Sequence, residues 1–202
     1  MFFDDERKQK ERRYAAEGRL PPGQSLTLKW PVLHEGDIPV FDPARWDFQV
    51  RGLVEKPLRL TWQEFQNLPQ IRAVADFHCV TAWSKFDNEW RGIPFRAIAD
   101  LVKPLPQARY VMVHADPGYT TNVPLEDLMR DNVLFATSHA PDPFTPEHGA
   151  PVRLVVPHLY AWKSAKWVRG LNFMDEDRPG YWERVGYHMY GDPFREQRYH
   201  GQ

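Results

Sequence analysis

Residues 77–84 read FHCVTAWS and contain Cys79, the only cysteine of this 202-residue chain. Residues 71–79 have the composition of a strand, so the thiol is expected where a strand ends and a loop opens. A single thiol excludes an internal disulfide and a structural zinc site built from several cysteines. Three roles stay open for Cys79: a buried apolar side chain, a nucleophile, or one soft ligand to a metal held mainly by other groups.

The neighbours of Cys79 favour some of these roles over others. A nucleophilic cysteine needs a base, and the adjacent His78 is poorly placed because successive side chains of a strand point to opposite faces. A metal needs no base, since the ion itself stabilises the thiolate. Judged from this stretch alone, a buried apolar cysteine is the default.

Composition limits the class of protein. Apolar residues make up 42% of the chain, which is enough for a hydrophobic core. The formal net charge is −1, whereas nucleic-acid binders usually carry a basic excess. No stretch approaches the length of about 18 apolar residues that a membrane span needs, and the first residues do not resemble an export signal. With a single thiol, these features predict a cytoplasmic protein that has no membrane span and does not bind nucleic acid.

The pattern of apolar residues and breakers predicts an α+β fold of mixed β-sheets with short helices. The 19 prolines disfavour a helical bundle, and strands do not alternate regularly with helices as in a doubly wound sheet. We expect strands at 48–54, 71–79, 109–114, 133–138, 152–156 and 166–173. Short helices are expected at 61–68, 94–102 and 124–130. A capping box of Thr61 and Glu64 opens the first of these helices.

The chain is expected to form one domain, residues 25–202, preceded by an arm. Residues 1–24 are polar and charged, and they end in LPPG at 20–23. This composition predicts a loosely attached N-terminal arm that is helical from Asp4 to Glu17. No repeat or long linker divides the rest of the chain.

Basic residues gather in the second half of an otherwise neutral chain. The stretch HGAPVR, residues 148–153, places His148 and Arg153 around a tight Gly-Ala-Pro loop, where both can face one anion. Taken alone, this stretch fits a surface turn that leads into a core strand.

A second basic stretch follows closely. In YAWKSAKW, residues 160–167, Lys163 and Lys166 flank Ser164, so ammonium, hydroxyl and backbone N–H groups can reach the same phosphate. The stretch also fits a solvated charged loop. Because its lysines lie close in the sequence to His148 and Arg153, the sequence favours an anion-binding site and a solvated loop equally.

Three stretches occur in the order known from one enzyme family. FHCVTAWS at 77–84, GYTTNVPL at 118–125 and the run 148–167 resemble the molybdopterin-binding domain of the sulfite oxidase family, in particular its short bacterial, MsrP-like branch. The resemblance extends over residues 31–199. It implies a sulfite oxidase-like fold and a molybdenum–molybdopterin cofactor. The pterin dithiolene of such a cofactor brings its own sulfurs, so one soft cysteinate is all that the protein must add.

The resemblance also implies roles for individual residues. Cys79 matches the cysteine whose sulfur ligates molybdenum, which makes it the metal ligand and the catalytic centre. Other positions match residues that hold the pterin, its phosphate or the walls of the cofactor pocket. These cofactor-binding positions are His34, Thr121, His148, Arg153, Ser164, Ala165 and Lys166.

The chain departs from the family pattern beside the cysteine. The family often has glycine where this chain has Ala82. Sulfite-oxidising members carry an arginine shortly after the cysteine, in a cluster that binds sulfite, whereas the first arginine after Cys79 is Arg91. Sulfite is therefore not the expected substrate.

The resemblance implies an oxidoreductase in which molybdenum cycles between Mo(VI) and Mo(IV). Such an enzyme moves an oxygen atom to or from a small-molecule substrate and exchanges electrons with a separate redox partner. Two other functions stay open: a non-catalytic molybdopterin-binding module, and a metal-free cysteine hydrolase or redox enzyme. The last requires a histidine against Cys79 and a thiol that reagents label readily.

Overall fold

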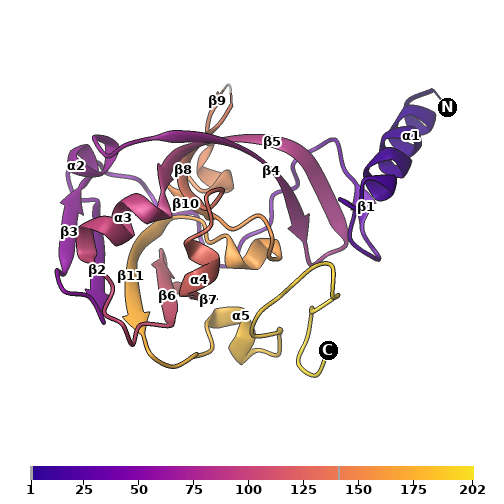
Figure 1. Ribbon diagram of the computed structural model, residues 1–202. Coiled ribbons are helices and arrows are strands. Elements are labelled where there is room, and N and C mark those ends of the chain that lie inside the picture. Colours follow the sequence, from indigo (N-terminus) through magenta and orange to yellow (C-terminus); the bar gives the residue numbers. More distant parts are fainter. Residues whose placement is uncertain (1, 141) are drawn as a thin grey trace.

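The structure is a computed structural model that describes residues 2–140 and 142–202. Two β-sheets with short helices confirm the predicted α+β fold (Figure 1). In the described part of the first sheet the strand order is β1-β5-β8-β10, with β4 paired to β5 and β9 paired to β8. Its strands are β1 Ser25–Leu26, β4 Ile71–Cys79, β5 Trp83–Pro94, β8 Leu134–His139, β9 Asp142–Pro143 and β10 Arg153–Val155.

The second sheet has the strand order β3-β2-β11-β6-β7. Strand β11 runs parallel to β2, and the other pairs are antiparallel. Gly170 of β11 lies so close to β2 that a Cβ atom there would stand 2.4 Å from the carbonyl oxygen of Gln49, so this approach requires glycine. The strands are β2 Asp47–Gly52, β3 Leu58–Thr61, β6 Tyr110–Ala115, β7 Tyr119–Pro124 and β11 Val168–Met174.

The main core is rich in aromatic rings. Phe48 of β2 and Phe135 of β8 are fully buried with ring centroids 5.2 Å apart, so rings from the two sheets touch. One face of α3 joins this core through Phe95, Ile98, Ala99 and Val102, which follow a helical spacing. The helices are α1 Phe2–Ala16, α2 Trp62–Gln66, α3 Phe95–Val102, α4 Leu125–Leu128 and α5 Tyr181–Arg184, with the 3-10 helices η1 Pro146–His148 and η2 Ala161–Lys163.

The predicted capping box and strands are present. Thr61 and Glu64 exchange the expected bonds at the start of α2, with Glu64 Oε2 2.8 Å from the Thr61 amide. The predicted strands are found within two residues of their expected ends. The prediction missed β5, the strand that follows Cys79. Every second residue of β5 is buried, but two of the buried residues, Ser84 and Asn88, are polar. The sequence of β5 therefore does not show the apolar–polar alternation that predicts a strand.

The N-terminal arm forms the predicted helix but is attached more firmly than expected. Tyr14, near the end of α1, is buried and its ring stacks on Phe86 at 4.0 Å. Arg19 forms salt bridges of 2.6 Å to Asp76 and 2.5 Å to Asp87, on strands β4 and β5. Only the outer end of α1 projects away from the body (Figure 1). These contacts fix the helix to the hairpin that ends near Cys79.

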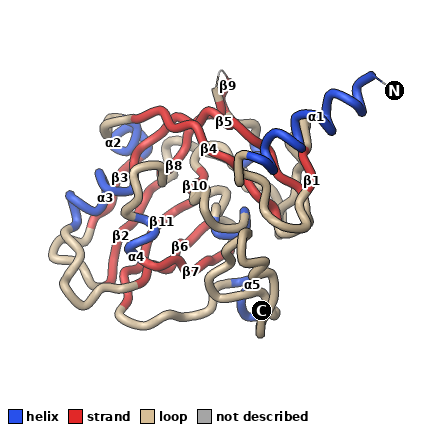
Figure 2. Tube along the Cα trace, turned by 45° about the vertical axis from the view of Figure 1, so that its right-hand side comes forward, coloured by secondary structure: helices blue, strands red, loops and turns tan. Residues whose placement is uncertain are grey.

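Residues 27–46 form neither helix nor strand, and we call them the strap. The strap runs from β1 in the first sheet to β2 in the second. Figure 2 shows α5 and the C-terminal loops beside β7, at the edge of the second sheet. No helix in the described chain is long and apolar enough to cross a membrane.

Candidate functional site

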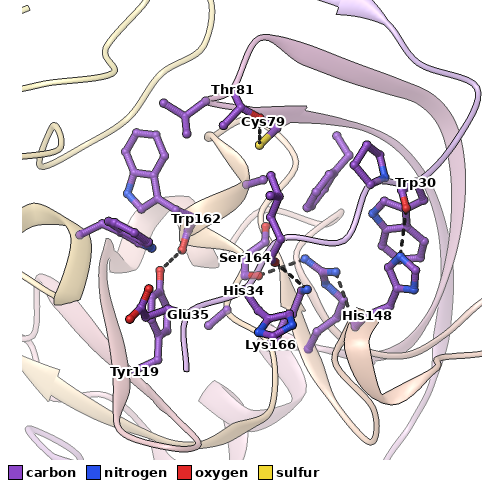
Figure 3. A pocket seen from close by; sticks show the side chains of 18 of the residues that line it. Trp30, His34, Glu35, Cys79, Thr81, Tyr119, His148, Trp162, Ser164 and Lys166 are labelled. Atoms are coloured by element: carbon purple, nitrogen blue, oxygen red, sulfur yellow. Dashed lines mark hydrogen bonds between the residues drawn. The ribbon is translucent and has the colours of Figure 1, made fainter. Parts of the chain in front are cut away.

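A cavity of about 310 Å³ lies where the strap, the end of β4, the start of β10, the loop after η2 and the C-terminal segment meet (Figure 3). Most of the predicted site residues line it. They are His34, Cys79, His148, Arg153, Ser164, Ala165 and Lys166. Segments that are far apart in the sequence therefore converge on one space.

Thr121 is the exception, because the structure does not place it in the lining of this cavity. It is fully buried on β7, lies outside the cavity lining, and its hydroxyl has no hydrogen-bond partner within the described residues. Tyr119, on the same face of β7, lines the cavity instead, and its hydroxyl donates to the Trp162 carbonyl at 2.6 Å. The longer side chain reaches the cavity wall, whereas Thr121 packs in the interior.

Cys79 is the last residue of β4 and only 7% exposed. Its sulfur lies 3.1 Å from the Thr81 hydroxyl oxygen. Burial raises the pKa of the Cys79 thiol, an effect opposed by hydrogen bonds from Thr81 and the Val80 amide and by the charge of Lys166. A raised pKa keeps the thiol protonated and weakly reactive until a metal displaces the proton.

His78 points away from Cys79, as its strand position predicts. Its Nδ1 atom lies 2.8 Å from the Ser84 hydroxyl, and its ring packs edge-on against Phe86. Burial lowers the pKa of His78 to about 4, so the ring is neutral. No histidine in the described chain forms a hydrogen bond with the Cys79 sulfur, whereas a cysteine hydrolase would need such a base.

Arg153 is a buried cation without an acidic partner in the described chain. Its side chain donates to the carbonyl oxygens of His148 at 3.0 Å and Ser164 at 3.2 Å, and Nε has no partner. The guanidinium lies over the rings of Phe77 and Trp30, at 5.0 and 5.5 Å from their centroids. Burial lowers the pKa of Arg153 to about 9. Burying such a charge without an anion is costly, so the site is suited to an anionic ligand.

Lys166 adds a second cation to the same wall. Its Nζ atom donates to the Leu33 carbonyl of the strap at 2.7 Å and to the Glu147 carbonyl at 2.5 Å. Burial and the nearby Arg153 lower the pKa of Lys166 to about 7. A phosphate between Lys166 and Arg153 would relieve their repulsion.

His148 stands beside this pair of cations. Its ring stacks on Trp30 at 4.2 Å, and Nε2 lies 3.3 Å from the Trp30 carbonyl oxygen. Burial lowers the pKa of His148. Gly149, at φ +113°, allows the close approach, because a Cβ atom there would lie 3.0 Å from Arg153 Cβ.

The loop after η2 offers backbone groups to the cavity. Ser164 Oγ accepts from the Val156 amide at 2.9 Å, and the Ala165 carbonyl accepts from Leu154 at 2.8 Å, so the loop is held in place. The backbone N–H groups of Ala165 and Lys166 donate no hydrogen bond to any acceptor in the described chain. Such amides are suited to an anion.

Lys163 does not share the role of Lys166, contrary to the idea that both flank one phosphate. It is fully buried and pairs with Glu183 at 2.6 Å, with further bonds to the carbonyls of Asn122 and Met189. Because η2 turns the chain between them, the two lysines point to different places. Lys163 joins η2 to α5 and the C-terminal segment.

Sequence reasoning missed one wall of the cavity. Tyr119, Trp162, Trp182 and Tyr187 line it, together with Glu35 of the strap. Burial raises the pKa of Tyr187, and the nearby Tyr199 and Cys79 contribute in the same direction. The density of aromatic residues in 181–190 is a signal that could have indicated this wall.

The donor set matches an anionic, sulfur-bearing cofactor. It combines one buried thiol, a buried arginine with an unpaired Nε atom, a lysine whose partners are carbonyls, and free backbone amides. A phosphorylated pterin dithiolene needs these groups: cations and amides for the phosphate, and one thiolate for its metal. Cys79 would hold the metal, and Arg153, Lys166 and His148 would hold the phosphate and the ring.

Comparison with known proteins agrees with this chemistry. Residues 35–182 match the family model described as oxidoreductase molybdopterin binding domain. The uncharacterized oxidoreductase YuiH of Bacillus subtilis is 47% identical over 191 residues, which are 94% of this chain and 96% of that protein.

More distant relatives are longer. The protein-methionine-sulfoxide reductase catalytic subunit MsrP of Campylobacter jejuni is 27% identical over 75% of this chain and 56% of its own length. The same subunit of Gluconobacter oxydans is 29% identical, and the chain spans 54% of it. The crystal structure of the sulfane dehydrogenase SoxCD of Paracoccus pantotrophus superposes with a TM-score of 0.66 at 22% identity, over 76% of this chain and 43% of that one. That likeness shows the fold.

Proposed function

The chain belongs to the oxidoreductase molybdopterin-binding domain family, within its MsrP-like branch, and we propose that it transfers an oxygen atom between a small substrate and water while a separate redox partner exchanges the electrons. Its cofactor is molybdenum–molybdopterin. When bound, this cofactor supplies a metal that changes its oxidation state by an electron pair and thereby gives or takes an oxygen atom.

One observation carries the proposal: a single buried thiol shares a cavity with two cations that have no acidic partner there. Cys79 would give up its proton to become a thiolate ligand. Arg153 and Lys166 would neutralise the cofactor phosphate, and the free amides of the loop after η2 would add hydrogen bonds. The aromatic wall leaves room for substrate on the other side of the thiol.

We propose that the reaction runs as the reduction of a sulfoxide-like substrate. Two curated relatives are named as sulfoxide reductase catalytic subunits, a name that also supports a separate electron donor. The sulfoxide oxygen leaves as water, with an electron pair from the partner and a pair of protons from solvent. The absence of an arginine between Cys79 and Arg91 disfavours an oxyanion such as sulfite. A cytoplasmic location is likewise a proposal, which rests on the single cysteine.

The experiment is metal and pterin analysis of protein made in a molybdenum-replete, cofactor-competent host. We expect equimolar molybdenum and pterin in the wild type, and loss of molybdenum in Cys79→Ala. Loaded protein should oxidise a reduced dye when dimethyl sulfoxide is added. Protein without molybdenum and pterin would contradict the cofactor assignment. Loaded protein that no oxygen donor or acceptor turns over would contradict catalysis and support the alternative, a binding module.

A further inference from the structure

The cavity has two unlike walls on either side of Cys79 (Figure 3). The cationic wall holds His148, Arg153 and Lys166 beside Trp30. The aromatic wall holds Tyr119, Trp162, Trp182 and Tyr187, and Glu35 lies on this side in Figure 3. An anionic cofactor belongs against the cationic wall. The aromatic wall is therefore the part of the cavity that a substrate meets.

The rings of the aromatic wall are held in fixed positions. The Trp162 indole N–H donates to Glu183 at 2.8 Å, and the Tyr119 hydroxyl donates to the Trp162 carbonyl at 2.6 Å. The ring of Tyr187 lies between Trp162 and Trp182, with centroid distances of 5.1 and 4.9 Å. A wall fixed in this way can discriminate between substrates, because it does not rearrange around a poor fit.

The electrostatic character of this wall is negative. The face of an aromatic ring is the negative side of its electric quadrupole, so it attracts cations. The buried carboxylate behind the wall, Glu183, is paired with Lys163 at 2.6 Å and adds no net charge. Glu35 is unlike it, because it is exposed, lines the cavity and has as its neighbour the neutral Tyr181 hydroxyl, whose pKa its carboxylate raises. On the aromatic wall, Glu35 is the charged residue that a substrate can reach.

We propose that the aromatic wall selects substrates that carry a positive charge near the reacting oxygen, and that Glu35 sets this preference. The inference rests on the proposed function and names the charge class of its substrate. A cationic group lies over the rings and pairs with Glu35, while the oxygen-bearing atom points toward the Cys79 side. An anionic substrate is repelled by the same groups.

The test is a charge series built on one sulfoxide. Methionine sulfoxide amide is a cation, N-acetylmethionine sulfoxide amide is neutral, and N-acetylmethionine sulfoxide is an anion. With loaded enzyme and a reduced dye, kcat/KM should fall in this order, by about tenfold from cation to anion, since an ion pair combined with cation–π contact has roughly that effect.

Substitution of Glu35 tests whether this residue sets the preference for cationic substrates. Glu35→Gln should lower kcat/KM for the cationic sulfoxide about three- to tenfold and leave the neutral one unchanged. Glu55→Gln is the matched control, because Glu55 is also exposed but lies outside the cavity. An effect of Glu35→Gln on all three substrates alike would overturn the specificity role.

A binding measurement tests the wall without turnover. Tetramethylammonium chloride should change the tryptophan fluorescence of the protein as isolated in a saturable way, and sodium chloride should not. Glu35→Gln should weaken this binding, and Trp182→Leu should weaken it further. Equal responses in the wild type and Glu35→Gln would contradict the proposal.

The outcomes separate this inference from the proposed function. Loaded enzyme that reduces all three sulfoxides equally, or prefers the anion, overturns the charge preference and leaves the proposed function standing. Loaded enzyme that reduces none of them counts against the proposed function. In that case the tetramethylammonium measurement alone decides whether the wall binds cations.

Discussion

Ala82 takes a left-handed backbone conformation, φ +67°, in the turn that presents Cys79. Its amide donates to the Cys79 carbonyl at 3.1 Å, which closes the turn between β4 and β5. Side chains other than glycine pay about 1–2 kcal/mol in this conformation. This cost explains why the family often has glycine at this position, since glycine adopts the left-handed conformation without strain.

Ala82→Gly should therefore stabilise the protein, by roughly 0.5–1 kcal/mol after the greater freedom of glycine in the unfolded chain is subtracted. Urea unfolding measures this free energy. Ala97→Gly inside α3 is the control and should destabilise by about 1 kcal/mol. A loss of stability in Ala82→Gly would contradict the argument.

Arg153 illustrates a conflict between stability and ligand binding. Because its buried charge has no acidic partner among the residues that the structure describes, Arg153→Met should leave the unfolding free energy of cofactor-free protein unchanged or raise it by up to about 2 kcal/mol. The same variant should lose pterin. Arg169→Met is the contrasting control: Arg169 pairs with Asp47 and Asp116, so its removal should lower stability but spare the cofactor. Lower stability in Arg153→Met would be the contrary result.

Lys166 should make the stability of cofactor-free protein depend on pH. Burial and Arg153 lower its pKa to about 7, whereas an unfolded lysine titrates near about 10.4. Between these values the unfolded state binds the proton and the folded state does not. The unfolding free energy should therefore rise with pH from 7 to 10, by up to about 1.4 kcal/mol per pH unit.

The measurement is urea unfolding at several pH values. Lys166→Met should flatten the rise, and Lys56→Met, at an exposed position, should not. If both variants keep the wild-type slope, Lys166 does not titrate in this range.

At the scale of elements, one buried ion pair joins η2 to α5. Both side chains, Lys163 and Glu183, are shielded from solvent, and Glu183 also accepts from the Trp162 indole. Lys163→Met should cost about 3–5 kcal/mol, because it leaves a buried carboxylate unpaired. Chemical unfolding gives the value, and the double variant Lys163→Met/Glu183→Gln should recover part of it. A cost below 1 kcal/mol would mean that water reaches the pair.

Sequence patterns located the strands and helices whose buried residues are apolar, and missed elements that bury polar residues. Strand β4 was predictable because apolar residues occupy its alternate positions from Ile71 to Cys79. The residues of the cationic wall follow from ordered motifs. Strand β5 was hidden by the buried polar Ser84 and Asn88, which bond to other side chains and to backbone. For the aromatic wall the sequence offered only the density of aromatic residues in 181–190, because Glu35 and Tyr187 reach the same cavity only through the paths of the strap and the C-terminal segment.

At the scale of the whole molecule, the strap joins the two sheets across the cavity. Lys166 holds its Leu33 carbonyl and His148 lies against its Trp30 carbonyl. Lys166→Met should therefore speed tryptic cleavage in the strap, after Lys29 or Arg45, several-fold. Mass spectrometry of a time course identifies the cuts, with Lys56→Met as the control. Unchanged cleavage would show that Lys166 does not hold the strap.

The cationic wall binds mainly backbone. Arg153 and Lys166 donate to carbonyl oxygens of residues 33, 147, 148 and 164, and a carbonyl is supplied by any amino acid. Substitutions at positions 33 and 147, which enter these contacts through their carbonyl oxygens, can therefore accumulate over evolution without dismantling the wall, provided that the chain keeps its path. Relatives at 27–29% identity illustrate how far such divergence runs. Comparing the path of the backbone in structures should therefore find this kind of site more often than comparing residue identities in sequences.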